Sequence, residues 1–215
     1  MLVKTKGSAI VGIDAVTITI EVNVSMGQGY CIVGLPDNAV KESLDRTESA
    51  IKSNGFHMPR TKLVINLSPA DLKKSGAAFD LPIAIGILAA SEQITQPSLI
   101  EKYVWMGELG LDGNLYPIKG ILAMAMQAKE EGFAAMIIPR QNAAEALMVE
   151  GISVFAFSSL QEVVYFLNNP YAEKQTKPQQ DHTSINQNMQ TEASPNFADI
   201  KGQSAAKRAL EIASA

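Results

Sequence analysis

The chain has 215 residues, of which 47% are hydrophobic and 19% charged, and its formal net charge is −4. This length suits one core of ordinary size, or one and a half domains, and the acidic balance excludes a broadly cationic nucleic-acid coat but not a local basic patch. A single cysteine, Cys31, excludes a disulfide framework and a thiolate metal cluster. The N-terminus lacks the apolar core of a signal peptide, and no uncharged apolar run of about 18 residues occurs. We therefore expect a cytoplasmic protein without a membrane span.

The composition of the chain changes near Asn168. Residues 1–168 mix strand and helix patterns and are predicted to fold as one domain. Residues 169–194 are rich in Gln, Asn, Thr, Lys and Pro, which favours a flexible linker because little apolar surface can be buried. Residues 195–215 contain a helical pattern that starts near Gln203 and stops without a C-cap, so we expect the beginning of a further module in a longer protein.

The first elements in chain order form a predicted hairpin. Apolar residues alternate with polar ones over 16–24, the period of a half-buried antiparallel strand, and residues 2–10 are expected to pair with it. A third strand at 30–33 follows a glycine pair, Gly27-Gln28-Gly29. That segment resembles a phosphate loop only loosely, because its spacing is not G-x-G-x-x-G, and we interpret it as a hairpin turn.

Helices and strands then alternate along the chain. Asp37 is expected to cap a helix that ends at Asn54-Gly55, and a helix from Asp80 is apolar nearly all round, as in a central helix. The other predicted elements are strands at 63–66, 103–108, 115–118, 135–138 and 153–156 and helices at 120–131, 141–148 and 159–167. Hairpins followed by crossovers predict an α+β or mixed-sheet α/β domain.

The loop 68–80 is the most distinctive polar segment. Lys73, Lys74 and Gly76 precede a helix N-terminus, which could hold an anion, and Ser75 could form a Ser–Lys nucleophile pair. The alternative is a solvated loop, with Gly76 in a special backbone conformation. His57 is interpreted as a surface residue of the loop after the first helix.

No carboxylate pair or phosphate-binding motif stands out. Four carboxylates lie near glycines without the fixed spacing of an acid–base pair or metal cage; they are Asp71, Asp80, Glu108 and Asp112. No G-x-x-x-x-G-K-[ST] occurs in the chain.

Three segments, residues 68–90, 107–133 and 197–215, together resemble the magnesium-chelatase-like AAA+ proteins. In that family an N-terminal domain similar to the protease domain of Lon precedes the ATPase module. The resemblance covers residues 1–167 and 195–215 and implies a ribosomal protein S5 domain 2-like, Lon-protease-like fold, followed by the truncated start of an AAA+ module.

The same resemblance bears on catalysis. The Gly-Pro-Ser-Ala-Gly stretch around the nucleophilic serine of Lon matches Gly76–Asp80, which puts Ala78 at the serine position, and the dyad lysine falls on Leu122. Neither side chain can attack a carbonyl or accept a proton, so a peptidase fold without peptidase activity is expected. The alternative is an active peptidase that uses Ser75 with Lys119 or Lys74.

For the tail, the resemblance implies the entry to an ATPase module. Ile200, Gly202 and Gln203 would begin an adenine pocket, with ATP and Mg²⁺ bound only in the complete protein and no cofactor in this part. The complete protein would be a ring-forming, ATP-dependent DNA motor that promotes branch migration during natural transformation. A role as a chelatase subunit is a further alternative, although no metal or tetrapyrrole site is evident.

Within that scheme, residues 1–168 would serve in ring assembly and in contact with DNA or a partner protein. Loop cations can neutralise phosphates, so the candidate DNA contacts are Arg60, Lys73, Lys74 and Lys119. Because the chain is net negative, we expect weak, salt-sensitive binding to DNA.

Overall fold

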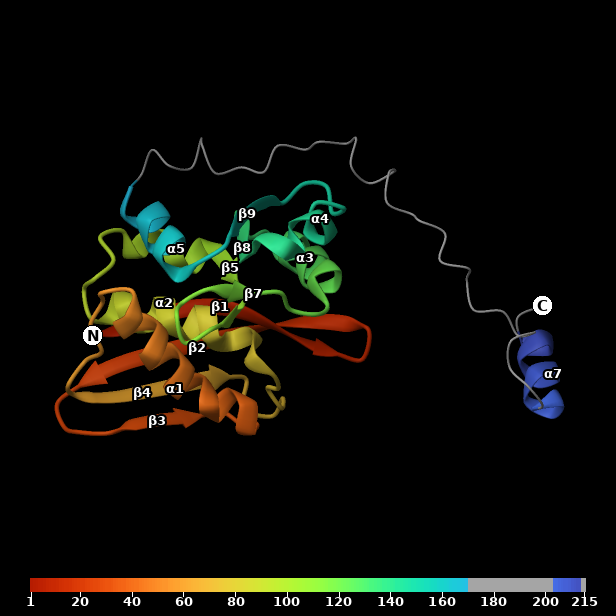
Figure 1. The fold of residues 1–215 in the computed structure, drawn as a ribbon, viewed down its shortest axis with the longest axis horizontal. Helices are drawn as coiled ribbons and strands as arrows, with labels where there is room; N and C mark the ends of the chain where they lie inside the picture. Colours follow the sequence, from red (N-terminus) through yellow and green to blue (C-terminus); the bar gives the residue numbers. More distant parts are fainter. Residues whose placement is uncertain (170–202, 214–215) are drawn as a thin grey trace. The chain divides into compact units, whose positions relative to one another are not determined.

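The computed structural model describes residues 1–169 and 203–213. The chain divides into two compact units, Met1–Pro178 and Gln179–Ala215. The first unit contains a seven-stranded mixed sheet in the order β3-β4-β2-β1-β5-β8-β9 (Figure 1). The predicted mixed-sheet α/β class is confirmed.

One half of the sheet is antiparallel except at its edge strand. β1 (Leu2–Val11) and β2 (Asp14–Ser25) make the predicted hairpin, and β4 (Lys62–Ser68) pairs antiparallel with β2. β3 (Tyr30–Val33) lies parallel to β4 at the edge of the sheet. The hairpin turn expected between β2 and β3 is therefore wrong, because β4 lies between these two strands and the glycine segment joins strands that are not neighbours.

Parallel strands form the other half. β5 (Tyr103–Trp105), β8 (Ala135–Pro139) and β9 (Ser153–Phe157) pair in parallel, as short apolar strands buried on both faces do. β5 joins this half to β1 through a single pair of residues, Lys6 and Val104.

Helices cover both faces of the sheet (Figure 1). On one face, α1 (Asn38–Ser53), α2 (Asp80–Ala90) and α5 (Leu160–Asn168) contribute to a single large apolar cluster. On the other, α3 (Ile121–Glu130) and α4 (Ala143–Ala146) pack against Val104, Met136 and Ile138.

Local sequence explains two of the three helices in the larger cluster. Asp37 caps α1, as predicted, because its Oδ1 accepts a hydrogen bond of 2.9 Å from the Val40 N–H. Every residue of α2 is buried, as its uniformly apolar sequence predicts. α2 approaches β2 so closely at Gly86 that a Cβ built there would lie 2.5 Å from Cγ2 of Val22.

Several predicted elements are shorter than expected, among them the strand predicted at 115–118, which spans only Leu115–Tyr116. The strand predicted at 103–108 is interrupted because Gly107 donates its N–H to the Ala78 carbonyl instead of continuing the sheet. A separate hairpin follows, made of β6 (Glu108–Leu109) and β7 (Leu115–Tyr116). The helix predicted at 141–148 is a 3-10 turn, Arg140–Asn142, followed by the single turn of α4.

The second unit contains α7 (Ser204–Ala213), which begins where the sequence predicts a helix. The predicted linker 169–194 lies outside the described residues except for Asn169. Within residues 1–169 and 203–213, no helix combines the length and apolar character needed to cross a membrane.

Candidate functional site

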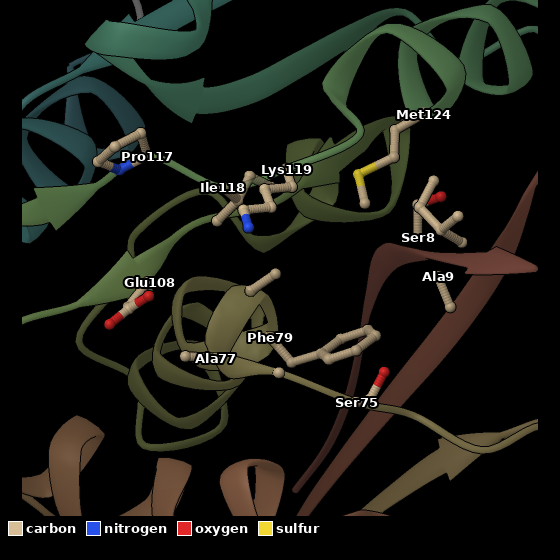
Figure 2. A pocket seen from close by; sticks show the side chains of 13 residues that line it. Ser8, Ala9, Ser75, Ala77, Phe79, Glu108, Pro117, Ile118, Lys119 and Met124 are labelled. Atoms are coloured by element: carbon tan, nitrogen blue, oxygen red, sulfur yellow. The ribbon is translucent and has the colours of Figure 1, made fainter. Parts of the chain in front are cut away.

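A pocket of about 340 Å³ opens beside the end of β1. Its walls come from Ser8–Ile10, from the Ser75–Phe79 segment, from Glu108, from Pro117–Lys119 and from Met124 of α3. Figure 2 shows Ser75 and Lys119 on opposite walls, with the ring of Phe79 between them. The pocket thus has an apolar floor and a polar rim.

The two positions matched to the Lon dyad lie in different places. Ala78 lines this pocket and presents only a methyl group. Leu122 instead lines a separate hollow of about 390 Å³ with Met126 and Met148, and 37% of its surface is exposed. Leu122 is on the outward side of α3, so the structure does not bring these two positions together.

Ser75 and Lys119, the alternative dyad, do share the pocket. Among the described residues, no hydrogen bond joins the Ser75 hydroxyl to either the Lys119 or the Lys74 ammonium. A nucleophilic serine needs a base within hydrogen-bond reach, and this arrangement does not supply one.

Lys74 corrects the expectation of a solvent-facing loop lysine. Its side chain is fully buried, and its ammonium donates hydrogen bonds to the carbonyls of Pro69 and of Leu72, the latter at 2.7 Å. Burial lowers the pKa of Lys74, because the charged form loses hydration. The ammonium stabilises its own loop and is not available to a phosphate.

The other candidate cations remain at the surface. Lys73, Lys119 and Arg60 are exposed, and of these only Lys119 lines the pocket. Gln203 is exposed and directly precedes α7, whereas Ile200 and Gly202 lie outside the described residues.

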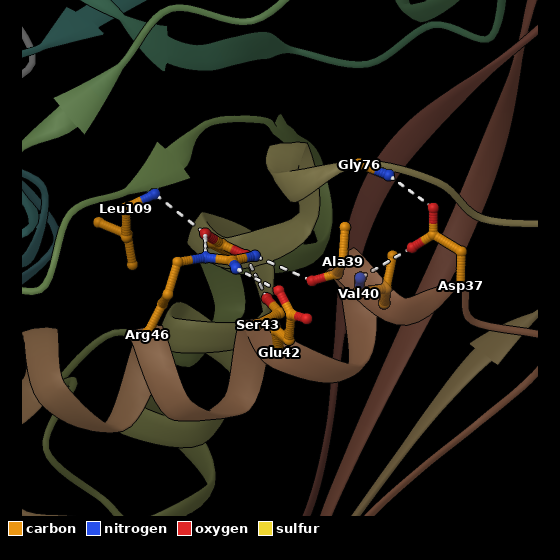
Figure 3. A network of polar contacts seen from close by, with 9 residues as sticks. Asp37, Ala39, Val40, Glu42, Ser43, Arg46, Gly76 and Leu109 are labelled. Carbon is orange, nitrogen blue, oxygen red and sulfur yellow. Dashed lines mark hydrogen bonds and ion pairs between the residues drawn. The ribbon is translucent and has the colours of Figure 1, made fainter.

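A buried ionic network holds two walls of the pocket (Figure 3). Asp80 has no exposed surface, and Arg46 contacts it through Nε at 2.8 Å and Nη2 at 3.0 Å. Ser43 donates its hydroxyl to the same carboxylate, and the Leu109 N–H donates at 3.2 Å. Asp80 directly follows the pocket segment Ala77–Phe79 and Leu109 follows Glu108, so one carboxylate fixes both segments.

Burial and hydrogen bonding act differently on the two charged groups of this network. Burial raises the pKa of Asp80 despite the hydrogen bonds from Arg46 and Ser43, which lower it. The hydrogen bond to Asp80 raises the pKa of Arg46. Sequence reasoning assigned Asp80 to the helix N-terminus and missed its partners; its one signal was a single charge at the start of an otherwise apolar helix.

The lining of the pocket combines polar groups with an apolar floor. Its exposed hydroxyl, carboxylate and ammonium groups come from Ser75, Glu108 and Lys119. In the described part of the chain, no cluster of three or more His, Cys, Asp or Glu side chains could hold a metal ion.

Comparison with known proteins adds the family. Residues 20–142 match the family model of subunit ChlI of Mg-chelatase. The chain is 39% identical over 208 residues to the uncharacterized protein YifB of Escherichia coli and 40% identical over 216 residues to the competence protein ComM of Haemophilus influenzae. Each alignment covers 96% of this chain but only 39% and 40%, respectively, of the relative.

A more distant similarity reaches the Lon proteases. The chain is 29% identical over 137 residues to Lon protease 2 of Bacillus subtilis, which covers 62% of the chain and 24% of that protein. This agrees with the Lon-like resemblance of the first domain. The family match spans more than half of the sequence, and the chain belongs to the magnesium-chelatase-like AAA+ family, that of subunit ChlI of Mg-chelatase.

Proposed function

We propose that residues 1–168 form a non-catalytic accessory domain of an AAA+ ATPase. The observation that carries this proposal is the pocket itself, where the methyl group of Ala78 stands at the serine position matched to Lon. Leu122 lies in another hollow and has no amine, so neither half of a Ser–Lys dyad is supplied. The fold would then serve as a scaffold for assembly and for partner binding.

The complete protein, in this proposal, is an ATP-dependent motor that forms a ring and acts on DNA during competence, promoting branch migration. The name of the Haemophilus influenzae relative supports a role in competence. This chain spans about two fifths of the length of such relatives, so ATP and Mg²⁺ would be bound by the remainder of the protein.

The proposal that residues 1–168 are non-catalytic is tested with the 215-residue chain. Incubation with fluorescent casein and, separately, with ATP and Mg²⁺ is expected to give neither cleavage nor phosphate release. Ser75→Ala is the matched control, because Ser75 shares the pocket with Lys119. Casein cleavage that disappears in Ser75→Ala would replace the proposal with an active Ser–Lys peptidase, and ATP turnover by the chain would also contradict it.

The motor activity is tested with the complete protein. Its ATP hydrolysis is expected to rise on addition of branched DNA, and a four-way DNA junction is expected to be resolved into duplexes only when ATP is present. A complete protein that hydrolyses ATP at the same rate with and without DNA, and leaves the junction intact, would exclude the DNA motor.

A further inference from the structure

One edge of β1 is only partly paired. Met1 and Val24 exchange two backbone hydrogen bonds, from the terminal ammonium of Met1 at 2.7 Å and from the Val24 N–H at 3.0 Å. In an antiparallel ladder such pairs alternate, so odd-numbered residues of β1 bond to β2. The N–H and C=O groups of the even-numbered residues, Ser8 and Ile10 among them, point to the opposite edge.

The strand that should cover that opposite edge stops early. β5 pairs with β1 only at Lys6, and the next outward N–H, that of Ser8, meets a thioether instead, Sδ of Met106 at 3.0 Å. The chain then leaves the sheet, because Gly107 bonds to the Ala78 carbonyl. Among the described residues, no backbone group bonds to Ile10 from this side, and 41% of its surface is exposed.

The edge of β1 that β5 leaves uncovered opens directly into the pocket described above. We call it the β1 slot and define it by Ser8, Ile10, Ala78 and Lys119. Phe79 and Met124 supply an apolar floor beneath it, suited to the alternate side chains of an extended strand. The ammonium of Lys119 has no ion-pair partner in the described part of the chain and would meet a carboxylate of the occupant.

We propose that the β1 slot binds an extended segment of a partner polypeptide as an added strand. Main-chain hydrogen bonds to the Ile10 N–H and the outward carbonyls would supply affinity, and the pocket would supply side-chain selectivity. The proposal rests on the proposed function in one respect: the bound segment is held and not cut.

Hydrogen exchange at the Ile10 amide tests the pairing. The probe is reduced, carboxymethylated α-lactalbumin, an acidic polypeptide that stays unfolded and offers many extended segments. In the isotope-labelled 215-residue chain, the Ile10 amide is expected to exchange quickly alone and about tenfold more slowly with saturating probe. Absence of protection would overturn the inference, as would protection present without probe, since the chain or a second copy would then fill the slot.

Two pairs of variants locate the binding. Ile10→Pro removes an N–H that makes no bond to β2, whereas Ile10→Val keeps it. Ser75→Trp fills the pocket mouth, whereas Ser75→Ala does not. Affinity is measured by fluorescence anisotropy of the labelled probe. Ile10→Pro and Ser75→Trp are each expected to lower the affinity about tenfold, which for Ile10→Pro corresponds to the loss of one hydrogen bond. Ile10→Val, which keeps the N–H, and Ser75→Ala, which leaves the pocket mouth open, should each lose less affinity than the variant with which it is paired.

These variants also separate the two proposals. Near-ultraviolet circular dichroism confirms the fold, and if Ile10→Pro fails to fold, the Ser75 pair decides alone. Equal binding by Ser75→Trp and Ser75→Ala would overturn the β1 slot and leave the non-catalytic assignment standing. Cleavage of the bound probe would contradict the proposed function while leaving the binding site intact.

Discussion

Arg46 and Asp80 form an ion pair across two helices, with the guanidinium on α1 and the fully buried carboxylate at the first residue of α2. Removal of the guanidinium would leave an uncompensated buried charge. Arg46→Met is therefore expected to lower the free energy of unfolding by about 3 kcal/mol, measured by urea denaturation. The matched control is Arg140→Met, because Arg140 and Glu162 are both exposed and 3.5 Å apart, and a change below about 1 kcal/mol is expected there. Equal losses in both variants would contradict the importance of the buried pair.

The pH dependence of stability should reveal Asp80. Burial raises its pKa in the folded state, so the folded chain retains this proton to higher pH than the unfolded chain does. The contribution of Asp80 is thus fully present below about pH 3.9, the unfolded value, and is lost as pH rises through the folded pKa. Asp80→Asn should remove this downward slope from plots of unfolding free energy against pH.

Glu21 provides the control of opposite sign. Hydrogen bonds from Asn66 and Lys4 lower its pKa, so its contribution is present above the unfolded value and is lost as pH falls through the folded value. Glu21→Gln should therefore lower the free energy of unfolding only at pH values above this transition. It should leave the slope of unfolding free energy against pH unchanged in the alkaline region. The same sign of effect in both variants would refute these assignments.

The close approach of α2 to β2 should make Gly86 sensitive to added volume. Gly86→Ala would place a Cβ against Val22, and overpacking of this kind is expected to cost about 1–3 kcal/mol of unfolding free energy. Because the clash involves one side chain, Val22→Ala in the same protein should recover part of the loss in a double-mutant cycle. Purely additive losses would show that the contact is not the cause.

Restoring the dyad chemistry at the matched positions should fail. Ala78→Ser combined with Leu122→Lys supplies a hydroxyl and an amine, but the two side chains would line different hollows. No cleavage of fluorescent casein is expected, with each single variant as control. Cleavage by the double variant alone would mean that α3 can rotate position 122 into the pocket.

Adjacent lysines should differ in DNA binding. Lys73 is exposed, whereas the Lys74 ammonium is enclosed by carbonyls of its own loop. For duplex DNA at low salt, Lys73→Met is expected to weaken binding and to reduce the slope of log affinity against log salt by about one. Lys74→Met should leave both quantities unchanged, and an equal effect of the two substitutions would reject this distinction.

Periodicity in the sequence was sufficient for most of the fold. The alternation in β2, the cap at Asp37 and the apolar α2 each follow from local rules, and all three are present in the structure. The order of β3 and β4 in the sheet could not be predicted, because pairing between strands that are distant in the sequence does not affect the local spacing of residues. The break after Trp105 was missed for a related reason, since it depends on the Ala78 carbonyl far along the chain.

The site was less predictable than the fold. Similarity to Lon pointed to Ala78, which does line the pocket, but also to Leu122, which does not. The buried state of Lys74 and the partners of Asp80 depend on tertiary packing that charge and spacing alone do not encode. The unpaired edge at Ile10 can be recognised only when both neighbours of β1 are known.

The two apolar clusters share strands, and this limits where residues can be inserted or deleted in the chain. In β8, Ala135 and Ile137 belong to one cluster and Met136 belongs to the other. Insertion or deletion of one residue within the strand would exchange the two sets and place each side chain in a space shaped for another. We expect relatives of this domain to vary in length in their loops and to keep β8 free of gaps.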